Sequence, residues 1–422
     1  MKTRETKKQK KPVVILSEAT DGVNKVRLLR AARAEEEEAC PWEEIDAYSG
    51  RFVVAGHRYA STDDDDPNRD DYHPWLAYST DGGETWIPSA TTANESQLHG
   101  ELRALAYGGG RFVAAGPRLT TSHNSNDPDT SNNYHPWLAY SADGGKTWTR
   151  SETTAADSQP HGRLYALAYG GGRFVVAGYR YGISSDGDTS NQYHPWLAYS
   201  TDGGETWTAS ATTANEEQPH GELRALAYGG GRFVVAGNRY DDTAGDTSEN
   251  NHPWLAYSAD GGKTWTASDT TAADSQPHGL LRALAYGGGR FVVAGWRAGI
   301  TSGDTSNNFH PWLAYSTDGG ETWTVNATTA NEEQPHGQLW GLAYGGGRFV
   351  VAGYRYGDTD DMSNQYHPWL AYSTDGGKTW TRNKTTTEEN QKHGQLWGLA
   401  YAPDSYCWKF GKKDEKEDEE EE

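Results

Sequence analysis

Short apolar runs that meet at glycine-rich turns recur along most of the chain. In one copy, the run from Leu102 to Tyr107 leads into Gly108-Gly109-Gly110, and a second run extends from Phe112 to Gly116. Two apolar runs joined by so short a turn are typical of a β-hairpin. A tyrosine precedes the turn in seven copies, at Tyr48, Tyr107, Tyr169, Tyr228, Tyr286, Tyr344 and Tyr401. The pattern therefore predicts seven hairpins, whose strands we call A and B.

A second unit alternates with this hairpin. A run such as Trp75-Leu76-Ala77-Tyr78 leads into Ser-x-Asp-Gly-Gly-x-Thr-Trp, which recurs every 57 to 62 residues. Glycine tolerates the positive φ of a tight turn, aspartate accepts hydrogen bonds from turn N–H groups, and tryptophan packs beneath the turn. The unit therefore predicts two further strands, C and D. Its six copies end at Trp86, Trp148, Trp207, Trp265, Trp323 and Trp380, and a degenerate seventh copy spans Val13 to Val26.

The repeated octapeptide resembles the Asp-box, or BNR repeat, of the β-propellers in the sialidase-like superfamily. The resemblance implies an all-β propeller fold over nearly the whole chain. It also implies that the boxes are structural and lie away from any active site. The residues concerned are Asp81, Trp86, Asp143, Trp148, Asp202, Trp207, Asp260, Trp265, Asp318, Trp323, Asp375 and Trp380.

Equal numbers of the two units predict a seven-bladed β-propeller of four-stranded antiparallel blades. Blades one to six read A-B-C-D along the chain, whereas the chain opens with a C-D pair and ends with an A-B pair. These two pairs are expected to form a composite seventh blade from residues 12–28 and 396–410, because closure removes exposed sheet edges. The propeller domain then spans residues 12–410. Residues 1–11 are a basic arm and residues 411–422 an acidic tail, both expected to be disordered.

Strand direction alternates in such a blade, so its connections sort onto two faces. The A–B turns and the Asp-boxes share one face, which we call the lower face. The longer, more variable B–C and D–A connections share the upper face, where binding residues are expected.

Three repeated elements flank the upper face: a His-Pro-Trp at the start of strand C, a His-Gly at the start of strand A, and an arginine after strand B. They are the candidate ligand-binding residues. The set is Arg58, His73, Trp75, His99, Arg118, His135, Trp137, His161, Arg180, His194, Trp196, His220, Arg239, His252, Trp254, His278, Arg297, His310, Trp312, His336, Arg355, His367, Trp369 and His393.

Other roles for these residues stay open at this point. The histidines and arginines can be architectural, capping carbonyls or pairing with loop aspartates, and the His-Pro-Trp tryptophans can pack between blades. A metal site is disfavoured, since carboxylate or cysteine ligands at fixed spacing are missing. No metal or cofactor is therefore expected.

Composition narrows the partners. A net charge of −21 argues against nucleic acid, which requires a basic stripe. No apolar run is long enough to span a membrane, and the basic start of the chain lacks the apolar region of a signal peptide, which favours a cytoplasmic location. The chain is also expected to be a monomer. The two cysteines, Cys40 and Cys407, are too few for a disulfide framework and are expected to stay reduced.

Repetition also bears on function. In sialidases an arginine lies in a Phe/Tyr-Arg-Ile-Pro stretch near the first blade, and the corresponding residues Pro41 to Tyr48 contain no arginine. Catalysis needs unique groups in differing environments, whereas near-identical blades repeat the same groups. We therefore expect a non-catalytic, multivalent carbohydrate-binding protein. The alternatives are a protein-interaction scaffold and, less favoured, a sialidase-like glycoside hydrolase.

Overall fold

Sheets of short antiparallel strands make up the regular structure of the chain. The computed structural model describes residues 14–20, 23–29, 43–45, 51–59, 72–81, 83–91, 100–119, 134–154, 162–181, 193–213, 220–240, 251–269, 278–298, 309–326, 336–356, 366–384 and 395–396. Within these residues there are five four-stranded and two three-stranded sheets, together with one 3₁₀ turn, η2 (Glu152–Thr154). No helix in this part of the chain is long and apolar enough to cross a membrane.

Each four-stranded sheet is one A-B-C-D unit, which confirms the predicted blade. The first sheet after the N-terminal region is three-stranded, with β4 (Phe52–Tyr59), β5 (Tyr72–Ser79) and β6 (Ile87–Pro88). Blade two has β7 (Ala104–Gly108), β8 (Arg111–Leu119), β9 (Tyr134–Ser141) and β10 (Thr149–Arg150); blade three has β11 (Gly162–Gly170), β12 (Arg173–Tyr181), β13 (Tyr193–Ser200) and β14 (Thr208–Ala209). Blade four has β15 (Gly221–Gly229), β16 (Arg232–Tyr240), β17 (Asn251–Ser258) and β18 (Thr266–Ala267). Blade five has β19 (Gly279–Gly287), β20 (Arg290–Ala298), β21 (Phe309–Ser316) and β22 (Thr324–Val325); blade six has β23 (Gly337–Gly345), β24 (Arg348–Tyr356), β25 (Tyr366–Ser373) and β26 (Thr381–Arg382).

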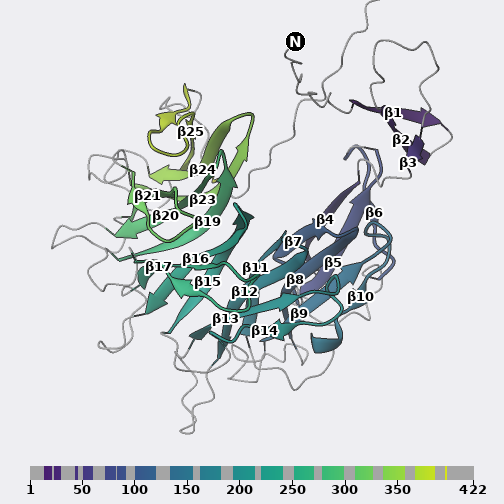
Figure 1. Ribbon diagram of the computed structural model, residues 1–422, viewed down its shortest axis with the longest axis horizontal. Helices are drawn as coiled ribbons and strands as arrows, with labels where there is room; N and C mark the ends of the chain where they lie inside the picture. Colours follow the sequence, from purple (N-terminus) through teal and green to yellow (C-terminus); the bar gives the residue numbers. More distant parts are fainter. Residues whose placement is uncertain are drawn as a thin grey trace, which may run out of the picture.

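The blades follow one another around an arc in chain order, as Figure 1 shows. In blades two to six, strand A lies on the inside of the arc, and successive A strands contact one another, β11 with β15, β15 with β19, and β19 with β23. This arrangement is that of a β-propeller, in which the first strand of each blade lines the axis.

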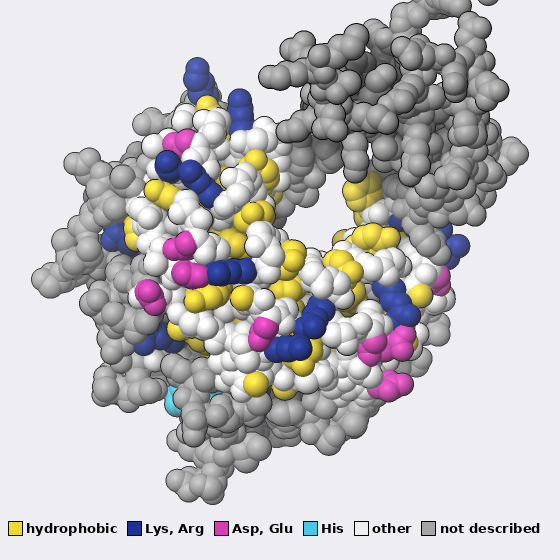
Figure 2. Space-filling view, in the orientation of Figure 1, with side chains coloured by type: hydrophobic (Ala, Val, Ile, Leu, Met, Phe, Trp, Pro, Cys, Tyr) yellow, Lys and Arg dark blue, Asp and Glu magenta, His cyan; other side chains and the backbone are white. Residues whose placement is uncertain are grey.

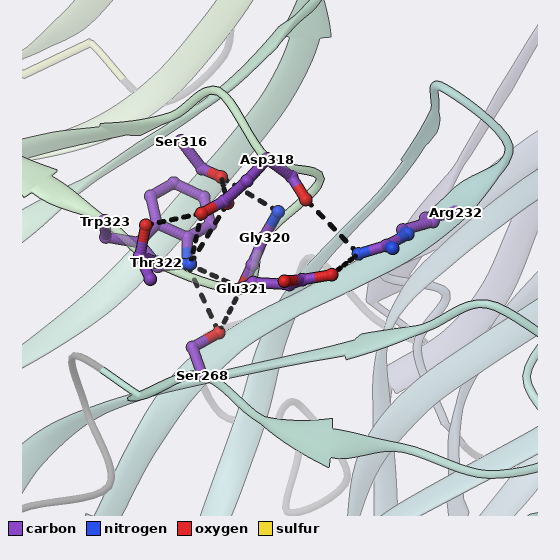
Figure 3. Close-up of polar contacts among 8 residues, drawn as sticks. All are labelled: Arg232, Ser268, Ser316, Asp318, Gly320, Glu321, Thr322 and Trp323. Atoms are coloured by element: carbon purple, nitrogen blue, oxygen red, sulfur yellow. Dashed lines mark hydrogen bonds and ion pairs between the residues drawn. The ribbon is translucent and has the colours of Figure 1, made fainter.

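The Asp-box closes the C–D connection by hydrogen bonds within the turn (Figure 3). In blade five, Ser316 Oγ donates to Asp318 Oδ1 at 2.7 Å, and Gly320 N donates to Ser316 Oγ at 2.8 Å. The carboxylate of Asp318 also accepts from the backbone N–H of Thr322 at 3.0 Å. Trp323 Nε1 donates to the carbonyl of Gly320 at 3.2 Å, which fixes the indole below the turn. The predicted structural role of the box is confirmed at this level.

Neighbouring blades are joined at the same lower face. Arg232, in the A–B turn of blade four, donates to the carbonyl of Asp318 at 3.2 Å and to Glu321 Oε1 at 2.6 Å in the box of blade five. Ser268 of blade four donates to the carbonyl of Gly320. Figure 3 shows both contacts reaching one box from the preceding blade. A–B turns and Asp-boxes therefore share one face, as expected.

In blades two to five, the glycine turn is covered by the tyrosine of the following blade. A Cβ built on Gly170 would lie 2.0 Å from Cγ of Tyr228, a separation that no side chain can adopt. The tyrosine ring therefore rests on bare backbone. The same contact joins Gly108 to Tyr169, Gly229 to Tyr286, and Gly287 to Tyr344.

Apolar layers between blades form the core. One layer joins Val175 and Leu197 of blade three to Phe233, Trp254 and Trp265 of blade four, all with at most 7% of their surface exposed. Burying a side chain of this size stabilises the fold by about 1.5–3 kcal/mol. Few but large aromatic residues thus suffice to fill thin layers.

The N-terminal strands differ in part from expectation. β1 (Val14–Thr20) and β2 (Val23–Leu29) form the predicted hairpin, but β3 (Glu43–Ile45) pairs with β2 rather than with β4. The expected strand A of blade one, beginning at Glu43, is therefore not part of that sheet. In sequence, the A–B turn of this blade is Ser49-Gly50, one residue shorter than the three-glycine turns of blades two to six.

The seventh blade stays a prediction, since residues 397–410 lie outside the described residues, as do the two charged ends and both cysteines. One contact supports it: Leu396 N donates to the carbonyl of Gly353 at 3.3 Å. The equivalent hydrogen bond between blades two and one runs from Leu102 N to the carbonyl of Gly56 at 3.2 Å. The side of blade one that would face a seventh blade is exposed. There Phe52 and Trp86 are 50% and 41% exposed, whereas the equivalent Phe174 is fully buried.

Candidate functional site

In blades three to six, a β-bulge in the innermost strand turns one side chain toward the axis. The A–B register skips one residue in blades three to six, between Leu164 and Ala166 and at the equivalent places. A bulge re-aims the side chain of its extra residue and is frequent beside active sites. The skipped residues are Tyr165, Arg224, Arg282 and Trp340, and Arg103 holds the same sequence position in blade two.

These five residues line a pocket of about 260 Å³, which we call the axial pocket. Arg224 lies over the ring of Tyr165 with its Cζ 4.9 Å from the ring centroid, and Arg103 lies 5.3 Å from the same ring. The guanidinium of Arg282 stacks more closely on Trp340, at 3.9 Å. In Figure 2, hydrophobic side chains border the opening that the blades surround, and basic and acidic side chains lie farther out.

Carboxylates neutralise two of the three pocket arginines. Arg103 pairs with Glu101 at 2.5 Å, and Arg224 pairs with Glu222, the carboxylate lying two residues before the arginine in both cases. In blade five the residue two before Arg282 is Leu280. The pocket thus holds one guanidinium that its own strand leaves without a carboxylate.

The environment of Arg282 disfavours its positive charge. Burial, together with the nearby charge of Arg224, lowers the pKa of Arg282 to about 10. An arginine normally stays charged far above this pH. A negative group placed in the pocket would offset both effects, so the pocket is electrostatically suited to an anion.

Sequence reasoning missed this pocket, although a signal was present. The repeats are nearly identical, but the residue between the conserved Leu and Ala/Gly of strand A changes from copy to copy. It is Arg103, Tyr165, Arg224, Arg282, Trp340 and Trp397 in successive blades, the last outside the described residues. Together with the residue two before it, which also varies, this position gives the blades an asymmetry that the boxes and rim residues lack.

The predicted rim residues do come together at the upper ends of the strands. Each strand-B arginine is the cross-strand partner of the strand-C histidine of its own blade. That histidine also meets the strand-A histidine of the next blade, with ring centroids 4.8 Å apart for His194–His220 and 4.7 Å for His252–His278 and His310–His336. His99, His161 and His393 lie outside the described residues.

Burial limits what these rim residues can contact. The six strand-C histidines are only 3% to 7% exposed. Five of the six His-Pro-Trp tryptophans are buried, and they belong to the apolar layers between blades; Trp75 is partly buried. These positions favour an architectural role for the tryptophans, the alternative raised from sequence, over a stacking platform for sugar.

The described residues contain no group of three or more His, Cys, Asp or Glu side chains suited to a metal ion. Beside the axial pocket, the carboxylates of Glu101 and Glu222 are paired with Arg103 and Arg224. The hydroxyl of Tyr240 donates to Glu222 at 3.2 Å, and burial together with this carboxylate raises the pKa of Tyr240, so its phenol stays neutral.

Comparison with known proteins gives the repeat family. The BNR/Asp-box repeat matches residues 77–86, 139–150, 198–209, 256–267, 314–325 and 371–382. No curated protein sequence matches the chain.

Solved structures resemble the chain at low identity. Trypanosoma rangeli sialidase is 16% identical with a TM-score of 0.42, over 88% of this chain and 59% of that one. The same sialidase in complex with sialic acid is 14% identical with a TM-score of 0.40, over 88% of this chain and 58% of that one. A Dyadobacter fermentans protein of unknown function is 18% identical with a TM-score of 0.43, over 76% of this chain and 90% of that one. The chain therefore spans less than two thirds of the sialidase chains. It is an all-β propeller protein built on six BNR/Asp-box repeats.

Proposed function

We propose that this protein is a non-catalytic carbohydrate-binding propeller whose ligand is an acidic saccharide held in the axial pocket. The observation that carries the proposal is the unmatched guanidinium of Arg282 beside two aromatic side chains in one 260 Å³ pocket. Saccharide sites combine aromatic faces with a few well-placed polar groups. A carboxylate or sulfate group on the sugar would supply the missing negative charge.

Binding without catalysis fits the groups around the pocket. Glycoside hydrolysis normally uses two carboxyl groups facing each other across the bond to be cleaved. Among the described residues, Glu101 and Glu222 are held by arginines, and the residues that line the pocket are three arginines, a tyrosine and a tryptophan. These side chains position a ligand and neutralise its charge, and they have no evident means of protonating a leaving group.

The six-fold rim site predicted from sequence is the second location to test. It would bind several saccharides per chain through the His-Pro-Trp, His-Gly and arginine residues, whereas the axial pocket would bind one. Stoichiometry therefore separates the two locations directly. Replacing the six strand-C histidines with alanine tests the rim, provided that the variant remains folded.

The experiment is a panel of uronate- and sulfate-bearing oligosaccharides with their neutral counterparts, measured by titration calorimetry. We expect acid-selective binding of one saccharide per chain, weakened about 10- to 100-fold by Arg282→Gln, because a charge-assisted hydrogen bond contributes about 1.5–3 kcal/mol. Arg348→Gln is the matched control, since this exposed arginine lies in an A–B turn of the lower face. Equal affinity for acidic and neutral sugars, or full affinity in Arg282→Gln, would refute the proposal.

A further inference from the structure

The acidic segment 411–422 is the chemical complement of the axial pocket. It contains eight Asp and Glu residues and three lysines, which gives a net charge of 3 − 8 = −5. The pocket has three arginines and two paired glutamates, a surplus of one positive charge from 3 − 2. Attraction between such groups is strong where water is partly excluded.

The course of the chain brings this segment within reach of the axis. Leu396 enters the inner ring beside Gly353 in the same way that Leu102 enters beside Gly56, and the residue after Leu102 is the pocket residue Arg103. Fourteen residues, 397–410, separate Leu396 from the acidic segment. Extended, they span up to roughly 45–50 Å. A four-stranded blade is only about 15 Å deep, so reach does not limit the contact.

We propose that segment 411–422 occupies the axial pocket of its own chain, with its carboxylates against Arg282, and that ligands must displace it. This inference rests on the proposed function, since it regulates the same site. A tethered segment has an effective concentration in the millimolar range. Even weak pairing therefore competes with an added ligand, and the apparent affinity falls by the fraction of pockets that are occupied.

The test uses the full chain with the eight acidic residues of the segment changed to Asn or Gln. The probe is a fluorescein-labelled peptide with the sequence of residues 411–422, followed by fluorescence anisotropy at about 50 mM salt. We expect the neutralised variant to bind the peptide at least about 10-fold more tightly than the unmodified chain, because its pocket is vacant. Raising the salt to about 200 mM should weaken this binding through screening.

Two further variants locate the contact. Adding Arg282→Gln to the neutralised chain should abolish the gain, whereas adding Arg348→Gln should preserve it. Equal peptide binding by the neutralised and unmodified chains overturns the proposal. So does a monomer–dimer equilibrium of the unmodified chain that disappears on neutralisation, since the occupant would then be the segment of a second copy.

Acidic saccharides separate this inference from the proposed function. If the neutralised chain binds the peptide through Arg282 but binds no acidic saccharide, the proposed function fails and the self-contact stands. If both chains bind the saccharide with equal affinity, the proposed function stands and the self-contact fails.

Discussion

Replacing Gly170 with alanine should destabilise the protein through a neighbouring blade. The added Cβ would lie 2.0 Å from Cγ of Tyr228, so the ring must leave its place on the turn. Displacing a packed aromatic ring costs about 3 kcal/mol, by comparison with the truncation of large core side chains. Gly170 itself has an ordinary backbone conformation, so the cost comes from contact alone.

Gly172, two residues along the same turn, is the matched control. It has a φ of +77° with nothing within 4 Å of the added Cβ, so alanine there meets backbone strain but no neighbour. That strain costs about 1–2 kcal/mol. We therefore expect Gly170→Ala to lower the free energy of unfolding by more than Gly172→Ala, as measured by urea titration of tryptophan fluorescence.

A double-mutant cycle identifies the cause. In a Tyr228→Ala background the obstructing ring is gone, so Gly170→Ala should change the free energy of unfolding by no more than about 0.5 kcal/mol. The reasoning is refuted if Gly170→Ala costs as much in that background as in the unmodified chain. It is also refuted if the two glycine substitutions cost the same.

Three further outcomes are expected. Burial raises the pKa of Asp375, but hydrogen bonds from Thr379 and Ser373 outweigh this effect and lower the pKa to about 2. Such a carboxylate stabilises the fold fully above its ordinary pKa of 3.8 and loses that effect as the pH falls towards 2. Acid unfolding, followed by fluorescence, should therefore move to higher pH in Asp375→Asn. Deleting residues 1–28 should lower the melting temperature and promote aggregation by exposing a sheet edge, and an unchanged melting curve would count against the composite blade. Thiol titration of the unreduced, denatured chain should find both Cys40 and Cys407 free, since a disulfide needs Cα atoms within about 7 Å and the two are expected near opposite faces; finding no free thiol would contradict this.

Local turn chemistry explains how much of the fold was predictable. The Asp-box glycines and the glycine hairpins specify their turns through positive φ and side-chain hydrogen bonds, so strand pairs and faces followed from sequence alone. The departure of β3 was not predictable in this way, because its pairing with β2 joins residues on either side of a long connection that no local turn signal specifies.

The candidate site was only partly predictable for a related reason. Sequence placed the rim histidines at the upper strand ends, which the pairs such as His194–His220 confirm, but burial depends on the adjacent blade. The axial pocket depends on a bulge, which breaks the alternation of side chains along a strand. Tyr165 and Arg282 therefore carry no period that identifies them as inward-facing.

The tyrosine-on-glycine contact gives the blades that it joins, blades two to six, a front and a back. A blade offers its tyrosine to the preceding neighbour and its bare glycine to the following one, so the joint is heterologous and could be repeated without limit. Such a joint does not by itself determine the number of blades. The number in the ring is then decided by how many repeats the gene encodes and by how its two ends meet. Gain or loss of one repeat by recombination would leave each joint chemically intact and change only the rotation between neighbours.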